Sequence, residues 1–175
     1  VHFVRGNPVR DETLLRASID SASHAIVLCR NENETASDNL NVSITLAIEG
    51  RNKSINTVVE IVDPASEELL RKTGCDRVVC TARFGAHFLN QELLNPGIQE
   101  VIEDLLSIQG GQNMYLVEVP KASSFSEISQ ACRQKGHIAV GVRTVERVLL
   151  NPEQSLAVKA GDKVITVGPE PIALG

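Results

Sequence analysis

Two short polar segments, Gly6-Asn7 and Cys29-Arg30, each follow an apolar run that predicts a β-strand. Open parallel sheets bind ligands at the carboxyl ends of their strands, so both segments are candidates for a ligand-binding rim. At such a rim, Arg30 is suited to contact a phosphate or a ribose. The alternative is structural: Gly6 relieves backbone crowding in a strand-to-helix turn, Pro8 starts the helix, and Arg30 is a solvated side chain.

The histidines, cysteines and serines of the sequence show no pattern typical of a catalytic site. The histidines are far apart along the chain, and no Ser or Cys has the sequence context of an activated nucleophile. The cysteines stand singly beside apolar neighbours, without the CxxC or Cys/His spacing of a zinc or redox site. We therefore expect no enzyme, and buried, reduced thiols in a reducing cytoplasm. The residues concerned are His2, His24, His87, His137, Cys29, Cys75, Cys80 and Cys132.

Composition excludes several other classes of protein. The 175 residues are 42% hydrophobic and 22% charged, which is typical of a folded globular chain of one large domain or two unequal lobes. Aromatic residues make up only 3% and the net charge is -5, so we expect no nucleic-acid partner. No apolar stretch approaches the roughly 20 residues that cross a bilayer, and no signal peptide opens the sequence. We expect this chain itself to be soluble.

The rim residues require strands to position them, and the first two thirds of the chain supply a suitable pattern. Short β-branched runs alternate with helical patterns of about ten residues, which predicts an α/β fold with a parallel sheet. The helix after the third run has Asp63 as a capping residue, Pro64 at its first position and Gly74 after its end. The predicted strands are residues 1–5, 25–29, 57–62 and 77–80, and the helices are residues 11–19, 37–50 and 63–73.

A second composition follows a longer helical segment. Residues 84–108 have apolar positions on two sides, and Asn95-Pro96-Gly97 divides them into two helices. Gly110-Gly111 predicts a mobile hinge, after which Ser124 and Glu127 form a capping-box pattern that begins a new helix. Strands are predicted at residues 114–119 and 138–142, and residues 155–158 and 163–167 are expected to pair as a hairpin around the turn at 159–162. The second lobe should be small and α+β.

Several of these segments resemble RCK (regulator of K+ conductance) domains. Residues 1–8, Val-His-Phe-Val-Arg-Gly-Asn-Pro, resemble the third strand and following loop of that family, and the later elements follow in the family's order. The resemblance extends through Leu94-Asn-Pro-Gly97, similar to the crossover helices, to the C-terminal lobe and covers nearly the whole chain. Other matching motifs are Ala25-Ile-Val-Leu-Cys29, Gly74-Cys-Asp-Arg-Val78, Met114-Tyr-Leu-Val-Glu-Val119 and Lys159-Ala-Gly-Asp-Lys-Val164.

The resemblance implies a Rossmann-like parallel sheet that lacks its first βαβ unit. The family's glycine-rich Gly-x-Gly-x-x-Gly turn is absent from the sequence, so we expect that unit to lie upstream or on a separate polypeptide. We also expect the chain alone to bind a dinucleotide weakly or not at all. The implied division is a partial nucleotide-binding lobe at residues 1–83, a crossover helix pair for dimerisation at 84–109, and the C-terminal lobe at 110–175.

The resemblance also implies ligands. In the family, the loop equivalent to Gly6-Asn7 lies near the adenine of a nucleotide, and carboxylates at places similar to Glu32, Glu60 and Glu118 bind calcium in some members. The expected ligand is therefore Ca2+ or a nucleotide such as NAD(H), ADP or ATP. Val62 stands where a second acid would assist a cation. A Glu60 that forms a salt bridge across a subunit interface is the alternative.

The function implied is ligand sensing at the cytoplasmic face of a membrane. The chain is expected to form a homo-oligomer, a dimer that assembles to a tetrameric or octameric ring, and to gate the pore domain of a potassium channel. Three alternatives remain: a regulatory subunit of a potassium transporter or antiporter, a fragment of a nucleotide-dependent oxidoreductase, and a purely structural oligomerisation module.

Overall fold

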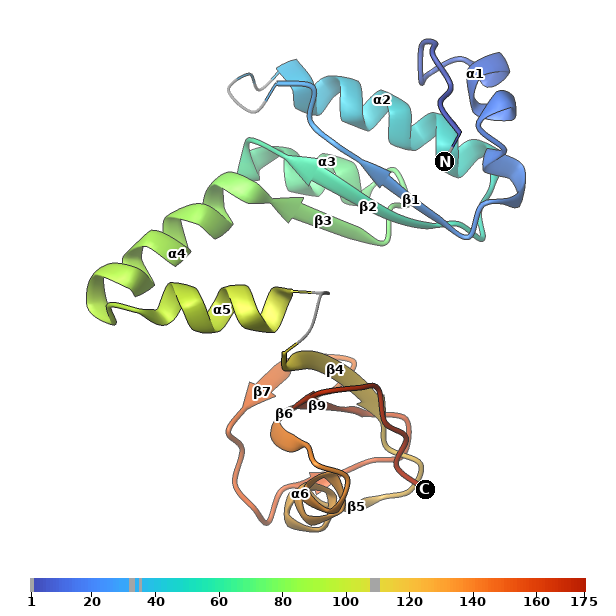
Figure 1. Cartoon of the computed structure of the whole chain (residues 1–175). Coiled ribbons are helices and arrows are strands. Elements are labelled where there is room, and N and C mark those ends of the chain that lie inside the picture. Colours follow the sequence, from blue (N-terminus) through green and yellow to red (C-terminus); the bar gives the residue numbers. More distant parts are fainter. Residues whose placement is uncertain (1, 32–33, 35, 108–110) are drawn as a thin grey trace. The chain divides into compact units, whose positions relative to one another are not determined.

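The computed structural model describes residues 2–31, 34, 36–107 and 111–175 (Figure 1). The chain forms two compact units, Val1–Gln91 and Glu92–Gly175, and the boundary falls within helix α4 (Thr81–Leu94). Each unit has its own hydrophobic core. Among the described residues, no helix is both long enough and apolar enough to span a membrane.

The first unit is built on a three-stranded parallel sheet. Its strands are β1 (His24–Val27), β2 (Asn56–Ile61) and β3 (Arg77–Cys80), paired in the order β1-β2-β3. Each of the predicted runs at residues 25–29, 57–62 and 77–80 forms one of these strands. Parallel strands that follow one another in space need crossover connections, and the intervening helices provide them.

The helices of this unit lie over one face of the sheet. They are α1 (Asp11–Arg16), the 3-10 turn η1 (Ile19–Ser21), α2 (Ala36–Arg51), the 3-10 turn η2 (Pro64–Ser66) and α3 (Glu67–Arg71). Figure 1 shows α2 and α3 over the same face of the sheet. The predicted helix at 11–19 ends early because Ser18 is left-handed, with φ 58°. The buried core is Leu14, Ile19, Val27, Ile44, Ile48, Ile55, Val59, Ile61, Leu70 and Cys80.

The strand predicted at residues 1–5 is absent from the described residues 2–5, and that prediction is wrong. A strand needs a neighbour that accepts and donates its backbone hydrogen bonds. Within the described part of the chain, β1 pairs with β2 alone and no strand lies beside residues 2–5. Phe3 is 94% exposed as a result.

The helix pair after β3 forms as predicted, with one earlier start. Helix α4 begins at Thr81, directly after β3, and α5 (Ile98–Leu106) follows the break at Asn95-Pro96-Gly97. The corner is held by Glu92, whose carboxylate accepts the N–H of Gly97 at 2.8 Å and of Gln99 at 2.9 Å. Gly97 has φ 95°, a conformation that favours glycine.

The second unit is a four-stranded antiparallel sheet with one helix. Strands β4 (Asn113–Glu118), β9 (Lys163–Gly168), β6 (Ile138–Arg143) and β7 (Val148–Leu150) pair in that order. Helix α6 (Phe125–Gln134) packs on one face and begins with the predicted capping box of Ser124 and Glu127. A second pair, β5 (Ser123–Ser124) and β8 (Ala157–Val158), is antiparallel. The buried core is Val117, Val119, Phe125, Ile128, Cys132, Val142, Val158 and Val164.

The predicted hairpin between residues 155–158 and 163–167 is wrong. Strand β8 pairs with β5, and β9 lies between β4 and β6. The turn at 159–162 binds the end of β4 instead: Gly161 N donates to Val119 O, and Val119 N donates to Asp162 O, both at 2.9 Å. Because both edges of β9 are occupied by longer strands, no edge remains for β8. Strand β7 was not predicted.

The Glu92 corner should depend on pH. The N–H groups of Gly97 and Gln99 hold the pKa of Glu92 below its ordinary value of 4.5. A carboxyl whose pKa falls on folding stabilises the corner above that ordinary value and loses the effect as the pH falls through the lowered pKa. Glu92→Gln should therefore speed amide hydrogen exchange at Gly97 and Gln99 at pH 7, measured by NMR.

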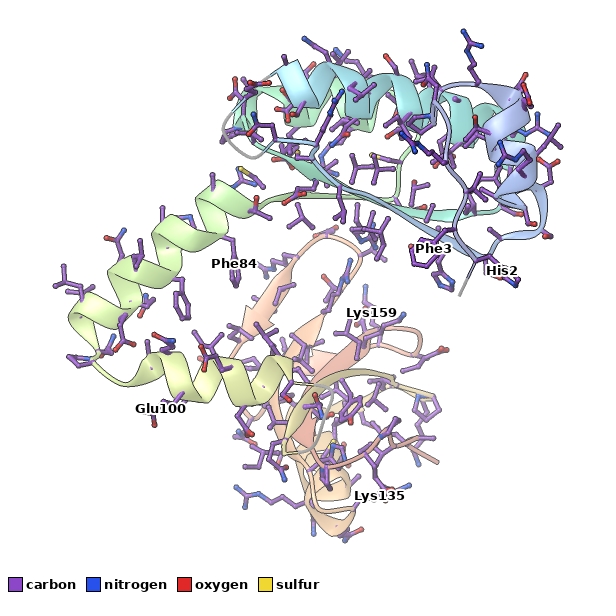
Figure 2. The ribbon with its side chains drawn as sticks, turned by 45° about the horizontal axis from the view of Figure 1, so that its top comes forward. His2, Phe3, Phe84, Glu100, Lys135 and Lys159 are labelled. Carbon is purple, nitrogen blue, oxygen red and sulfur yellow. The ribbon has the colours of Figure 1, made fainter. Side chains whose placement is uncertain are left out.

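The control for this experiment is Glu100→Gln, an exposed carboxylate on α5 (Figure 2). It should leave the exchange of both amides unchanged. Equal protection in the Glu92→Gln variant and the unmodified chain would show that the corner does not depend on this carboxylate.

Candidate functional site

The carboxyl ends of β1 and β2 meet the first turns of α2, and this junction brings four polar side chains together. Cys29 follows β1, Glu60 lies near the end of β2, and Asp38 and Asn41 lie on α2. The N–H of Cys29 donates to Glu60 Oε2 at 2.8 Å, and its thiol donates to Asp38 Oδ1 at 3.8 Å. The predicted rim residues Cys29 and Glu60 are thus in direct contact.

Asp38 is the most constrained member of this group. It is 1% exposed, and its carboxylate accepts the N–H of Val62 at 2.9 Å and of Asp63 at 3.0 Å. Hydrogen bonds from neutral donors to a buried carboxylate are strong because one partner is ionised. Asp38 therefore fixes the segment after β2 against α2.

Asn41 lies one helical turn further along α2 and is also 1% exposed. Its Nδ2 donates to the backbone oxygen of Glu60 at 2.9 Å and to Cys29 Sγ at 3.4 Å. Its Oδ1 is buried and accepts no hydrogen bond from the described residues. A buried acceptor without a donor is costly, and this atom has almost no accessible surface in the structure.

The Cys29 thiol is not a nucleophile in this setting. Burial, and then the charges of Glu60 and Asp38, raise the pKa of the Cys29 thiol to about 11. The thiolate is the reactive form of cysteine, and it is a minor species at neutral pH when the pKa is this high. Cys29 therefore acts here as a hydrogen-bond donor that links β1 to α2.

The other predicted nucleotide-site residues form local contacts. Asn7 Oδ1 accepts the N–H of Val9 at 3.0 Å, and the Asn7 backbone oxygen accepts the N–H of Arg10 at 3.1 Å, which turns the chain into α1. A Cβ on Gly6 would lie 2.5 Å from Thr13 Oγ1, so a side chain at residue 6 would force Thr13 to move. Pro8 does not start the helix, because α1 begins at Asp11 with Arg10 as its N-cap, and the role of Gly6 and Asn7 in binding a ligand stays a prediction. Arg30 is exposed at the end of β1.

The predicted calcium residues do not form a cluster in the described residues. Glu32 lies outside the described part of the chain, and Glu118 is exposed on β4, in the other unit. Calcium takes six to eight oxygen ligands. Across residues 2–31, 34, 36–107 and 111–175, no group of three or more His, Cys, Asp or Glu side chains is placed to hold a metal ion. Glu60 has Asp38 nearby, but both oxygens of Asp38 already accept backbone N–H groups.

The sequence motif Asp38-Asn39-Leu40 also resembles the family, but neither Asp38 nor Asn41 was predicted as a site residue, although their spacing carried a signal. Positions 38, 41, 45 and 48 lie along one stripe of α2, and all four are buried. Three of these four residues are polar. A polar residue on the buried stripe of a helix must bind something, because an unpaired buried polar group is destabilising. This pattern is the signal from which a polar junction at the amino end of α2 could have been predicted.

Comparisons with known proteins agree with this architecture. Residues 1–81 match the family model described as the TrkA-N domain. The chain is 25% identical over 166 residues to Potassium channel protein 1 of Methanocaldococcus jannaschii, across 93% of this chain and 48% of that protein. It is 21% identical over 171 residues to the calcium-gated potassium channel TvoK of Thermoplasma volcanium, across 94% of this chain and 49% of that protein.

The chain thus spans about half the length of these relatives. Both are named as potassium channels, in agreement with the expectation that the chain is not an enzyme. Among solved structures, the human SLO3 gating ring matches with a TM-score of 0.73 and 18% identity, across 95% of this chain and 36% of that one. That likeness shows the fold.

These matches confirm the resemblance that the sequence motifs suggested. The similarity is not limited to the parallel sheet, because each aligned relative covers more than nine tenths of the chain and so reaches both units. Residues 1–81 match the TrkA-N domain model, and the whole chain is similar in sequence to part of two potassium channels.

Proposed function

We propose that this chain is a ligand-sensing regulatory domain that gates a potassium channel, acting as a homo-oligomer on a membrane pore domain at the cytoplasmic face. The observation that carries the proposal is the similarity to two potassium channels through both units of the chain. The alternative of a regulatory subunit for a transporter or antiporter shares the same mechanism and differs only in the membrane partner.

The junction of β1, β2 and α2 supports a mechanism for sensing. Cys29, Asp38 and Glu60 join three elements through one set of hydrogen bonds, and Asp38 also fixes Val62 and Asp63. A ligand that exchanges hydrogen bonds with this network binds one arrangement of these elements better than another. That difference in affinity is the only free energy available for gating, and a tenfold shift requires about 1.4 kcal/mol.

A nucleotide is the ligand class that the described residues favour. Arg30 supplies an exposed cation for a phosphate. Asn41 Oδ1, a buried acceptor with no donor among the described residues, would accept a hydroxyl or an amino group if the junction opens. Calcium remains the second candidate, because TvoK is named as calcium-gated and Glu60 lies at this rim. A nucleotide phosphate would pair with the cation of Arg30, whereas Ca2+ would bind the carboxylate of Glu60. Substitutions at these two residues can therefore distinguish the two ligands.

The oligomer is proposed to form through α4 and α5. No residue of either helix is buried, and apolar side chains of α4 such as Phe84 (Figure 2) project from the helix. Exposed apolar patches of this kind usually mark association surfaces. The exposed fractions are Phe84 58%, Leu89 70%, Leu93 79%, Leu94 73%, Val101 53% and Leu106 59%.

The association surface is tested by placing a charge on it. Leu93→Glu should lower the oligomer mass measured by light scattering, because desolvating a carboxylate opposes burial of the helix. Asn90→Glu introduces the same charge at an exposed polar position of α4 and should leave the mass unchanged. A folded Leu93→Glu chain with the mass of the unmodified protein would show that this surface is not the interface.

The ligand is tested in two steps. Calorimetry on the 175-residue chain should give dissociation constants for NADH and ATP weaker than about 1 mM, or no heat, because the glycine-rich turn is absent from the sequence. Micromolar binding by this chain would show that the site is misplaced.

The second step measures K+ flux into vesicles that carry the full-length gene product. A nucleotide response should weaken by about tenfold or more in Arg30→Gln, because the arginine pairs with phosphate. A calcium response should persist in Arg30→Gln and be lost in Glu60→Gln. Measurable flux that ignores NADH, ATP and Ca2+ alike would contradict ligand gating.

A further inference from the structure

The second unit contains a polar hollow between α6 and the segment that follows β7. Its volume is about 550 Å³, which is within the range of small-molecule binding sites. Sites of this size are usually lined by apolar side chains, whereas this hollow has a mainly polar lining and suits a polar ligand. The polar residues are Ser126, Ser129, Gln130 and Arg133 of α6, and Asn151 and Gln154 after β7.

Backbone hydrogen bonds fix both walls of the hollow. The N–H of Ser126 donates to Gln154 O at 3.0 Å, which ties the first turn of α6 to the segment after β7. The N–H of Asn151 donates to Val140 O at 2.8 Å, which ties that segment to β6. The hollow is therefore formed before a ligand binds, and this lowers the entropic cost of binding.

Asn151 has an uncommon backbone conformation. Its φ is 46°, in the left-handed region, although it precedes Pro152 and a residue before proline favours extended backbone. Strained backbone is concentrated at binding and catalytic sites. The strain at Asn151 is therefore a second indication, besides the polar lining, that this segment has a binding role.

The hydroxyl of Ser129 is buried at the hollow and makes no hydrogen bond with any described residue. The side chains of Gln130, Arg133, Asn151 and Gln154 also make none within the described part of the chain, but they are exposed and can bind water. Ser129 differs from them, because an unpaired buried hydroxyl lowers the stability of the fold. A ligand in the hollow can supply the missing partner.

Arg133 determines the charge of the ligand. Among the described residues it is the only charged side chain that lines the hollow, and its guanidinium can bind a carboxylate or a phosphate through two parallel hydrogen bonds. A phosphate also favours the free N–H groups of a helix N-terminus. At the start of α6, the N–H groups of Phe125 and Ser126 already donate to backbone oxygens of the segment after β7. The hollow therefore favours a carboxylate.

We propose that this hollow binds a small hydroxycarboxylate. Arg133 binds the carboxylate, and Ser129, Asn151 and Gln154 bind hydroxyl groups along the ligand. An amino acid fits less well, because no acidic side chain of the described residues lines the hollow to pair with its ammonium group. The site does not rest on the proposed function, since it shares no residue with the junction of β1, β2 and α2 or with α4 and α5.

The ligand class is tested on the 175-residue chain with sodium gluconate, a polyhydroxy monocarboxylate, at constant ionic strength. NMR should show shifts of the backbone amides of Ser129, Arg133 and Asn151 that are half-saturated at about 10 mM or less. Sorbitol has the hydroxyl groups without the charge, and hexanoate has the charge without the hydroxyl groups. These two compounds and inorganic phosphate should each bind about tenfold more weakly than gluconate.

The role of the guanidinium is tested by removing its charge. Arg133→Gln should weaken gluconate binding by about tenfold or more, because the bidentate pair with the carboxylate is lost. Lys121→Gln removes an exposed cation of the same unit that does not line the hollow, and it should leave binding unchanged.

Ser129→Ala distinguishes a binding role from a structural one. Removing an unpaired buried hydroxyl should raise the midpoint of thermal unfolding by about 2 °C, while gluconate binding weakens about threefold or more. A hydroxyl that only supports the fold would give a lower midpoint and unchanged binding. Fluorescence of Tyr115 on β4 follows the second unit alone, because the chain has one tyrosine and no tryptophan.

Three results would overturn the proposal: no saturable shift with gluconate, gluconate binding that Arg133→Gln leaves unchanged, or sorbitol, hexanoate or phosphate that binds as tightly as gluconate. Circular dichroism checks that each variant is folded.

Discussion

The carboxylate of Asp38 is the constraint on which the first unit depends. It is buried at the start of α2 and accepts two backbone N–H groups from the segment after β2, at 2.9 and 3.0 Å. A buried charge is tolerable only when such donors satisfy it. Asp38 thereby links the start of α2 to the segment between β2 and α3, and its contact with the Cys29 thiol adds the end of β1. Cys29, which belongs to the proposed ligand rim, donates to Asp38 and Glu60 in this junction, so a ligand at the proposed rim would act on these elements.

The sequence predicted the elements whose signals are local. The strand runs at 25–29, 57–62 and 77–80, the capping box of Ser124 and Glu127, and the break at Asn95-Pro96-Gly97 all depend on neighbours along the chain, and all are present. The capping role of Asp63 also holds, through the N–H of Ala65 at 2.9 Å.

The predictions that failed concern contacts between distant segments. Strand β9 pairs with β4 and β6, although the nearby turn at 159–162 favoured a local partner, because two long strands bury more apolar surface than two residues of β8. The role of Asp38 also requires knowing that Val62 and Asp63 return to α2, some 24 residues away in the chain. Residue type identified Cys29 and Glu60 as rim candidates, and only the fold shows that they touch.

Each unit buries a core of its own and leaves other apolar surfaces exposed. In the first unit, the face of the sheet opposite α2 carries Ile26 at 71% exposed and Leu28 at 67%. In the second unit, Met114 on β4 is 52% exposed and Ile138 on β6 is 62% exposed, and α4 and α5 have no buried residue. Because the cores are complete without these surfaces, association can form and dissolve while both units stay folded. Under the proposed function, contacts of these surfaces would be able to shift with ligand binding, whereas contacts within a core would not, since breaking them unfolds the unit.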